Sequence, residues 1–256
     1  MDAFELIFGA GLVIFSLGLM VVFNPFLHKR FYKRLRQIEA VESLKKASGL
    51  SVEEGKRLHI SLGSASLLSP QIGSALVGLN VLERLSQVSI ASDNPPTVTS
   101  GEGALSMLSQ ATLKSSYESG NALDPYAFDQ ARLSGTTPFA YAAGSLATIQ
   151  DDKVSSNILI GHFGPEVALM SDAVERQGTR LIAASDAMEG QAVIYGATKD
   201  VLIGEELFAL PAYIKSNPFQ QTSLRVQDIL RWVIIGGILA GTVFKIIQII
   251  FGGSGS

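Results

Sequence analysis

Two long apolar segments near the ends of the chain constrain its fold more than any other feature. Leu6 to Leu27 carries no charged residue over 22 positions, and Trp232 to Phe251 carries only one, Lys245. An α-helix of about 20 residues reaches across the hydrocarbon core of a bilayer, which is about 30 Å thick. Lys245 lies close to one end of its segment, where a lysine can extend to the lipid headgroups. The segments predict transmembrane helices at 1–27, including a short N-terminus, and at 232–251.

The alternatives are a signal peptide for the first segment and a buried core helix for the second. A signal peptide normally has positive charges before its apolar stretch and small residues at its end. Here Asp2 and Glu5 precede the stretch, and no A-x-A-like site follows it. The pattern therefore favours a retained transmembrane helix at the first position.

Basic residues flank both apolar segments on the side of the chain's middle. The first segment is followed by Lys29, Arg30, Lys33, Arg34 and Arg36. Arg225 and Arg231 precede the second segment. Positively charged flanks stay in the cytoplasm, so both segments predict a cytoplasmic middle and an N-terminus outside. We expect the five basic residues to lie at the membrane surface, which makes the lipid bilayer the first predicted partner.

The middle of the chain divides into a connector, a folded domain and a second connector. Residues 28–57 predict a basic juxtamembrane helix or connector, because charged and apolar positions recur there at helical spacing. Residues 58–214 form the predicted cytoplasmic domain, and 215–231 connect it to the second span. The final residues 252–256 (GGSGS) resemble a flexible, artificial linker and support no structural argument.

Short apolar runs alternate with helical periodicity through residues 58–214. Strands are predicted at 58–62, 97–99, 131–133, 154–160 and 180–184, and helices at 72–88, 103–119, 138–150, 165–177 and 190–213. Strands separated by helices of about 12 or more residues form parallel sheets. The predicted fold class is α/β and Rossmann-like: a mostly parallel sheet of four or five strands wrapped by helices, flanked by one transmembrane helix on each side.

Composition excludes several kinds of site. The chain has no cysteine, which rules out disulfides, cysteine-ligated zinc and a thiol nucleophile. A net charge of −3 gives no electrostatic footprint for nucleic acid, so no nucleic-acid partner is predicted. The histidines, His28, His59 and His162, lack the spacing of metal ligands. We therefore predict no metal site and no cofactor.

Three glycine-bearing loops follow predicted strands, at the sheet edge where open parallel sheets bind ligands. Backbone N–H groups in these loops could hold an anion. The candidate ligand-binding residues are Gly101, Gly135, Gly161, His162 and Gly164. Tight, capped turns are the alternative, because none of the loops matches G-x-G-x-x-G or G-x-x-x-x-G-K-[ST]. Glu102 and Glu166, at the starts of the following helices, would also repel a phosphate.

His162 is the candidate catalytic base, since it follows the strongest predicted strand and has Glu166 four residues later. A histidine that only caps a loop would show the same local pattern. The sequence contains no G-x-S-x-G motif and no recognisable S-x-x-K context. These observations favour a protein that is not an enzyme and leave the catalytic residues open.

The second apolar segment carries small residues on one helical face. Gly237 and Gly241 lie four positions apart, with Gly236 and Ala240 beside them. Such faces allow close helix packing in membranes, either within one chain or between chains. We therefore predict transmembrane packing at Gly237 and Gly241.

Six motifs resemble those of a family of bacterial membrane proteins that carry a domain of unknown function. The motifs are RLHISLG at 57–63, PPTVT at 95–99, FAYAAG at 139–144, NILIGHFGPE at 157–166, LIGEELF at 202–208 and R-x-x-D-x-x-R-W at 225–232. The resemblance covers most of residues 57–232. It implies an α/β domain anchored by two transmembrane helices in the bacterial inner (cytoplasmic) membrane. It implies no activity, cofactor or catalytic residue.

Two functional hypotheses follow. In the first, the protein is a membrane-anchored structural or assembly protein whose α/β domain self-associates into a homo-oligomer or docks onto a membrane complex. The paired apolar segments and the low charge of the chain, 17% charged residues against about 25% in soluble domains, favour it. In the second, the α/β domain is a ligand-binding, sensory or enzymatic module that uses the strand-end loops around His162.

Overall fold

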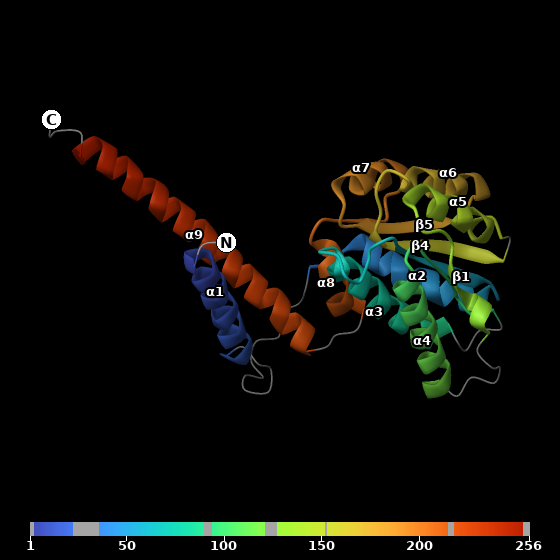
Figure 1. Ribbon diagram of the computed structural model, residues 1–256. Coiled ribbons are helices and arrows are strands. Elements are labelled where there is room, and N and C mark those ends of the chain that lie inside the picture. The colour runs from blue at the N-terminus through green and yellow to red at the C-terminus, as the bar shows by residue number, and fades with distance from the viewer. Residues whose placement is uncertain are drawn as a thin grey trace. The chain divides into compact units, whose positions relative to one another are not determined.

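Six parallel strands form the centre of residues 35–215, one of the two units into which the chain divides (Figure 1). The strands are β1 (Arg57–Gly63), β2 (Thr97–Ser100), β3 (Ala131–Leu133), β4 (Val154–His162), β5 (Arg180–Ser185) and β6 (Val201–Ile203). Their order across the sheet is β3-β2-β1-β4-β5-β6. The structure is a computed structural model that describes residues 3–22, 36–89, 94–120, 127–151, 153–214 and 218–252.

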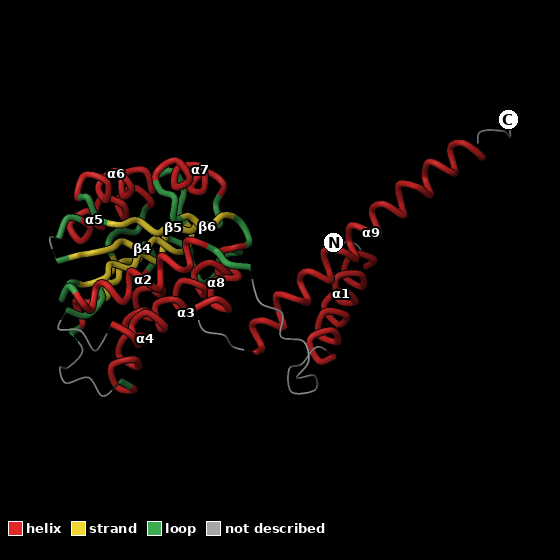
Figure 2. The backbone as a smooth tube through the Cα atoms, turned by 180° about the vertical axis from the view of Figure 1, so that it is seen from behind, coloured by secondary structure: helices red, strands yellow, loops and turns green. Residues whose placement is uncertain are grey.

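Helices cover both faces of the sheet, which confirms the predicted α/β fold class (Figures 1 and 2). One face carries α2 (Glu39–Glu53), α3 (Ile72–Ser89), α4 (Gly103–Ser119) and α8 (Glu206–Ile214). The other carries α5 (Pro138–Ile149), α6 (Val167–Gln177) and α7 (Met188–Ala197). A short 3₁₀ helix, η1 (Phe128–Gln130), precedes β3.

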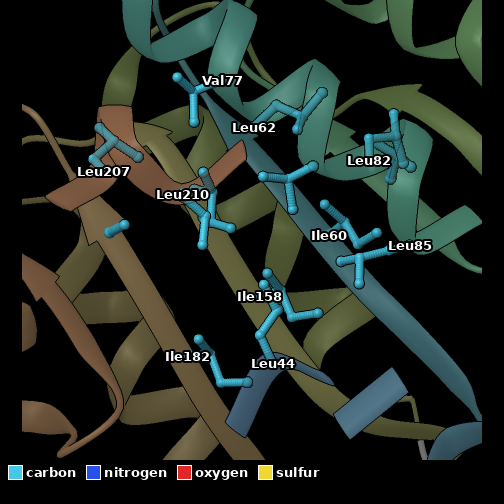
Figure 3. Close-up of a cluster of buried hydrophobic side chains, with 14 of the residues drawn as sticks. Leu44, Ile60, Leu62, Val77, Leu82, Leu85, Ile158, Ile182, Leu207 and Leu210 are labelled. Carbon is cyan, nitrogen blue, oxygen red and sulfur yellow. The ribbon is translucent and has the colours of Figure 1, made fainter. Parts of the chain in front are cut away.

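Each face of the sheet has its own core. Along β1, Ile60 and Leu62 point to the first face, where they pack with Leu44 of α2, Leu82 of α3 and Leu210 of α8 (Figure 3). Successive side chains of a strand point to opposite faces. The alternate β1 positions therefore lie under α5, α6 and α7, where the second core is built from residues such as Tyr141, Leu159, Phe163, Met170 and Ile194.

The predicted helix over 190–213 is wrong, because the structure divides that stretch. Helix α7 ends at Ala197, β6 follows at Val201–Ile203, and α8 begins at Glu206. Gly204, at φ +60°, turns the chain between β6 and α8. The three residues of β6 continue the apolar pattern of the stretch around them, so the sequence does not separate the sixth strand from the helices on either side.

Helix α2 differs from the expected juxtamembrane connector. Its apolar side packs into the core of the first face through Ala40, Val41, Leu44 and Ala47. Helix α2 is therefore one of the helices that cover this face of the sheet. Its helical spacing suits either role, and only the contacts with the sheet distinguish them.

The other unit, residues 1–34 with 216–256, contains α1 (Ala3–Val22) and α9 (Pro218–Gly252), which contact each other. The connector expected at 215–231 is instead helical from Pro218 onward, because nothing in its sequence interrupts the helix. Helix α9 contains a stretch, Thr222–Gln248, that is long and apolar enough to cross a membrane. The described apolar part of α1, Gly9–Val21, is shorter.

Candidate functional site

Parallel strands bring all of the predicted loops to one edge of the sheet. In the order β3-β2-β1-β4-β5-β6, the strands that follow β1 are added on one side of it and the strands from β4 onward on the other side. The order of the strands therefore reverses between β1 and β4. Open α/β sheets bind ligands at this switch point, beyond the carboxyl ends of the strands. The loops after β2, β3 and β4 were predicted. The loop after β1, from Ser64 to Gln71, also lies there, although sequence reasoning did not identify it.

The glycines of the predicted loops face other parts of the chain. A Cβ atom on Gly101 would lie 2.8 Å from the Cβ of Ser64, and one on Gly161 would collide with the Leu62 carbonyl oxygen. A Cβ on Gly135 would meet the backbone of Ala140. Close contact with a neighbouring loop, with the first turn of α5 and with β1 therefore explains Gly101, Gly135 and Gly161, because the chain itself fills the space that they leave.

Two helix starts near the switch point carry their own carboxylates. Oε2 of Glu102 accepts a hydrogen bond from the Leu105 N–H at 2.7 Å in the first turn of α4. Before α6, Oε1 of Glu166 accepts one from the Gly164 N–H at 2.8 Å, and only 2% of Glu166 is exposed. An anionic ligand at either position would meet a negative charge instead of free N–H groups.

His162 is paired with Asp186 and not with Glu166. The imidazole Nδ1–H donates a hydrogen bond to Asp186 Oδ1 at 2.7 Å. The two residues meet because β4 and β5 are neighbours in the sheet and their ends are in register. About 30% of the His162 side chain is exposed, against 14% for Asp186. The hydrogen bond with Asp186 is the main reason why the pKa of His162 is raised above its usual value.

Ser185 holds the two loops of this pair together. Its hydroxyl donates to the Phe163 carbonyl oxygen at 2.9 Å and accepts from the N–H groups of Phe163 at 3.2 Å and Ala187 at 3.1 Å. Phe163 directly follows His162, and Asp186 lies between Ser185 and Ala187. The fully buried Ser185 hydroxyl therefore fixes the backbone on both sides of the pair.

A buried polar chain crosses the face of the sheet below this edge. Tyr141 Oη lies in a short hydrogen bond with Ser61 Oγ and accepts one from the Gly63 N–H at 3.1 Å. Ser61 Oγ lies 3.2 Å from Thr99 Oγ1, which lies 2.9 Å from His59 Nε2. The His59 Nδ1–H donates to Asn157 Oδ1 at 2.7 Å. All five side chains are completely buried.

Burial shifts the pKa values of both titratable groups in this chain of hydrogen bonds. Desolvation lowers the pKa of His59 to about 4 and raises the pKa of Tyr141 to about 12. Both groups are therefore neutral at physiological pH, and the polar chain acts as a structural link between β4, β1, β2 and α5. Sequence reasoning missed it, although the alternation of polar and apolar residues in RLHISLG marks one polar face on β1.

Helix α5 presents an exposed face without a charged or amide side chain. The polar residues of the helix, Tyr141, Ser145 and Thr148, point inward and are buried. The residues that remain exposed are Pro138, Phe139, Ala140, Ala143, Gly144 and Ala147. We name this set the α5 face. Phe139 is 61% exposed, whereas α6 on the same side of the sheet exposes the charged Asp172, Glu175 and Arg176.

The remaining predicted residues are two glycines of α9 and the five basic residues that follow the first apolar segment. A Cβ on Gly237 or Gly241 of α9 would meet no other atom within 4 Å, so their face is open in the single chain. Of the five basic residues, Lys29, Arg30, Lys33 and Arg34 lie outside the described residues. Arg36 Nη2 donates to Glu206 Oε1 at 2.9 Å on the surface of the α/β unit. Among the described residues, no group of three or more potential metal ligands occurs.

Comparisons with known proteins identify a family and nothing more specific. The chain matches neither a curated protein nor a solved structure. The model of one protein family, described as a domain of unknown function, matches residues 5–254, which is nearly the whole chain. The chain therefore belongs to the DUF6754 family.

Proposed function

We propose that the protein is a membrane-tethered assembly protein whose α/β unit self-associates with other copies of the chain through the α5 face. The observation that carries the proposal is that this face is exposed and entirely apolar. Exposed apolar patches without charges are typical of protein interfaces, because a solvated helix normally carries charged or amide side chains.

The composition of the α5 face suits a second copy. Ala140, Ala143, Gly144 and Ala147 leave a shallow surface, and Phe139 projects beside it. A two-fold axis would set each Phe139 against the small residues of the other copy, as a self-complementary interface requires. Attachment to a membrane also concentrates copies in one plane, so that a modest interface suffices for assembly.

The membrane arrangement is part of the same proposal. Both α1 and α9 cross the bilayer, and the α/β unit lies in the cytoplasm, at the inner membrane of a bacterium. The basic residues that follow α1, together with Arg225 and Arg231 before the most apolar part of α9, support this orientation. The open glycine face at Gly237 and Gly241 supplies a second surface for contact between copies.

Placing a charge on the α5 face tests the proposal. We expect the gently solubilised full chain to form a defined oligomer by light scattering and Ala143→Glu to shift it to monomers, since each interface would bury an unpaired carboxylate. Ala168→Glu, at an exposed alanine of α6, is the matched control and should assemble as the wild type does. A monomeric wild-type chain at all concentrations, or an Ala143→Glu variant that assembles normally, would overturn it.

A further inference from the structure

The His162–Asp186 pair has the arrangement of a histidine prepared for proton transfer. Asp186 accepts the Nδ1–H, so the neutral imidazole keeps its lone pair on Nε2. Nε2 makes no hydrogen bond to any residue in the described parts of the chain, and about 30% of the side chain is exposed. The carboxylate therefore occupies the Nδ1 side of a partly exposed ring and leaves Nε2 without a partner among the described residues.

We propose that His162 is a general base at the carboxyl edge of the sheet, oriented by Asp186, that takes a proton from a neutral or cationic small molecule. The pair sits at the ends of β4 and β5, beside the switch point between β1 and β4 where sheets of this order hold ligands. The proposal does not depend on self-association through the α5 face.

The scaffold around the pair is rigid, as a preorganised site requires. The three hydrogen bonds of the Ser185 hydroxyl tie the loop after β4 to the loop after β5. The Gln191 side-chain amide donates to the Ser185 carbonyl oxygen at 2.9 Å and secures the same turn from α7. A histidine that only capped a loop would need neither this bracing nor a carboxylate behind its ring.

The charges near His162 indicate the class of substrate. Asp186 after β5, Glu166 before α6 and Glu189 in α7 all act on the imidazole, and all are acidic. Their combined field favours the imidazolium that forms when His162 accepts a proton. The same field repels phosphates and carboxylates, so the substrate is neutral or positively charged.

The proposed step is a single proton transfer from the substrate to His162. Nε2 of His162 binds the proton, the electron pair of the broken bond stays on the substrate, and the Asp186 carboxylate stabilises the new imidazolium. Release of the proton to product or water restores the starting state. Asp186 is a positioning residue in this scheme, because it acts only through His162.

A base-catalysed elimination measures this property without knowledge of the natural substrate. In neutral 5-nitrobenzisoxazole, a base removes the ring C–H proton, the electron pair forms the nitrile, and the N–O bond breaks to release a coloured phenolate. We expect the full solubilised chain to accelerate this reaction about a hundredfold over His162→Gln in the same detergent. His28→Gln, which removes a histidine outside the described residues, is the control and should react as the wild type does.

The pH profile separates a base from a structural histidine. Asp186→Asn should slow the elimination and move its inflection to lower pH, because the hydrogen bond that raises the pKa of His162 is weakened. Circular dichroism of each variant establishes that it is folded. A wild-type rate equal to that of folded His162→Gln, or an unchanged inflection in Asp186→Asn, would overturn the proposal. The proposed substrate class would be overturned if the chain accelerated the elimination of a carboxylate-bearing benzisoxazole more than that of the neutral one, with each rate divided by the rate that free imidazole gives.

Discussion

The fully buried His59 shows how a single polar residue can be accommodated in the centre of this sheet. Both ring nitrogens have partners, Asn157 on β4 and Thr99 on β2, so that the ring bridges the two neighbours of β1. Buried polar groups are tolerated only when such partners are present. Since His59 on β1 and its two partners join three strands, the histidine also favours one register of those strands over others.

Acid should destabilise the fold through His59. The pKa of His59 is about 4 in the folded chain and about 6.5 when unfolded. Between these values the unfolded chain binds more protons, so the free energy of unfolding decreases as the pH falls from about 6.5 towards 4. The full effect is on the order of 3 kcal/mol.

Thermal unfolding of the solubilised chain at pH 5 and pH 7, followed by circular dichroism, measures this loss. In His59→Gln the melting temperature should be lower at pH 7 but should depend less on pH. His162 acts in the opposite direction, because its raised pKa contributes stability at low pH that is lost as the pH rises through the folded value. A pH dependence in His59→Gln as steep as that of the wild type would contradict the expectation.

At the candidate site, the sequence alone identifies His162 but not Asp186, its hydrogen-bond partner. His162 could be predicted because it ends a long apolar strand. Asp186 lies 24 residues later, and only the register of β4 with β5 brings the two together. Glu166 is closer in sequence, but its carboxylate turns back to the Gly164 N–H. Local spacing therefore suggested the wrong carboxylate.

Among the elements, length alone does not decide which could be predicted, because the three-residue β3 was expected and the three-residue β6 was not. The helix expected at 103–119 and the strand at 131–133 have the observed bounds of α4 and β3. Helix α6 begins two residues later than expected, at Val167, and ends as expected at Gln177, where Gly178 adopts the left-handed conformation that stops many helices. Strand β6 and the role of α2 depend on packing against the sheet, which periodicity does not show.

The ends of β1 and β4 lie in close backbone contact at Gly63 and His162. Gly55, a glycine with a similar φ and no such contact, is the matched position for a test. Gly63 and Gly55 have similar φ values, +76° and +62°. A Cβ at Gly63 would lie 2.6 Å from the His162 backbone nitrogen, whereas a Cβ at Gly55 meets nothing within 4 Å. Gly55→Ala should cost about 1 kcal/mol of stability from backbone strain alone.

Gly63→Ala should lower the free energy of unfolding clearly more than Gly55→Ala does. At Gly63 the backbone strain and the collision add, and the atoms in collision belong to the His162 backbone, which cannot move aside as a flexible side chain can. Thermal unfolding of the two variants, side by side, gives the difference. The Gly63→Ala substitution should also disturb the backbone at His162, so the rate of the elimination reaction should fall in Gly63→Ala and not in Gly55→Ala. Equal melting temperatures would show that the strand ends separate easily.

At the scale of the whole molecule, α9 is longer than a membrane requires. Its 35 residues extend for about 52 Å, whereas the hydrocarbon core is about 30 Å thick. If the part from Trp232 onward fills the core, the first four turns of the helix stand outside it. In the proposed arrangement, the helix therefore continues from the membrane into the aqueous phase without a break.

The absence of cysteine makes the predicted orientation simple to measure. Single-cysteine variants Ser119→Cys, at an exposed position of α4, and Asp2→Cys, before α1, can be labelled with a membrane-impermeant maleimide. In intact cells only Asp2→Cys should react, and in inverted vesicles only Ser119→Cys. Labelling of both variants from the same side would show that α1 does not cross the membrane.

The contact between α1 and α9 has a consequence for biosynthesis. The two helices are separated by roughly 200 residues, which a ribosome translates in about 10 to 40 s. During that interval α1 exists without its helical partner, while the complete sequence of the sheet emerges. In the proposed arrangement, the α/β unit can therefore finish folding while it is attached to the membrane through α1 only, and the contact between the two helices forms last.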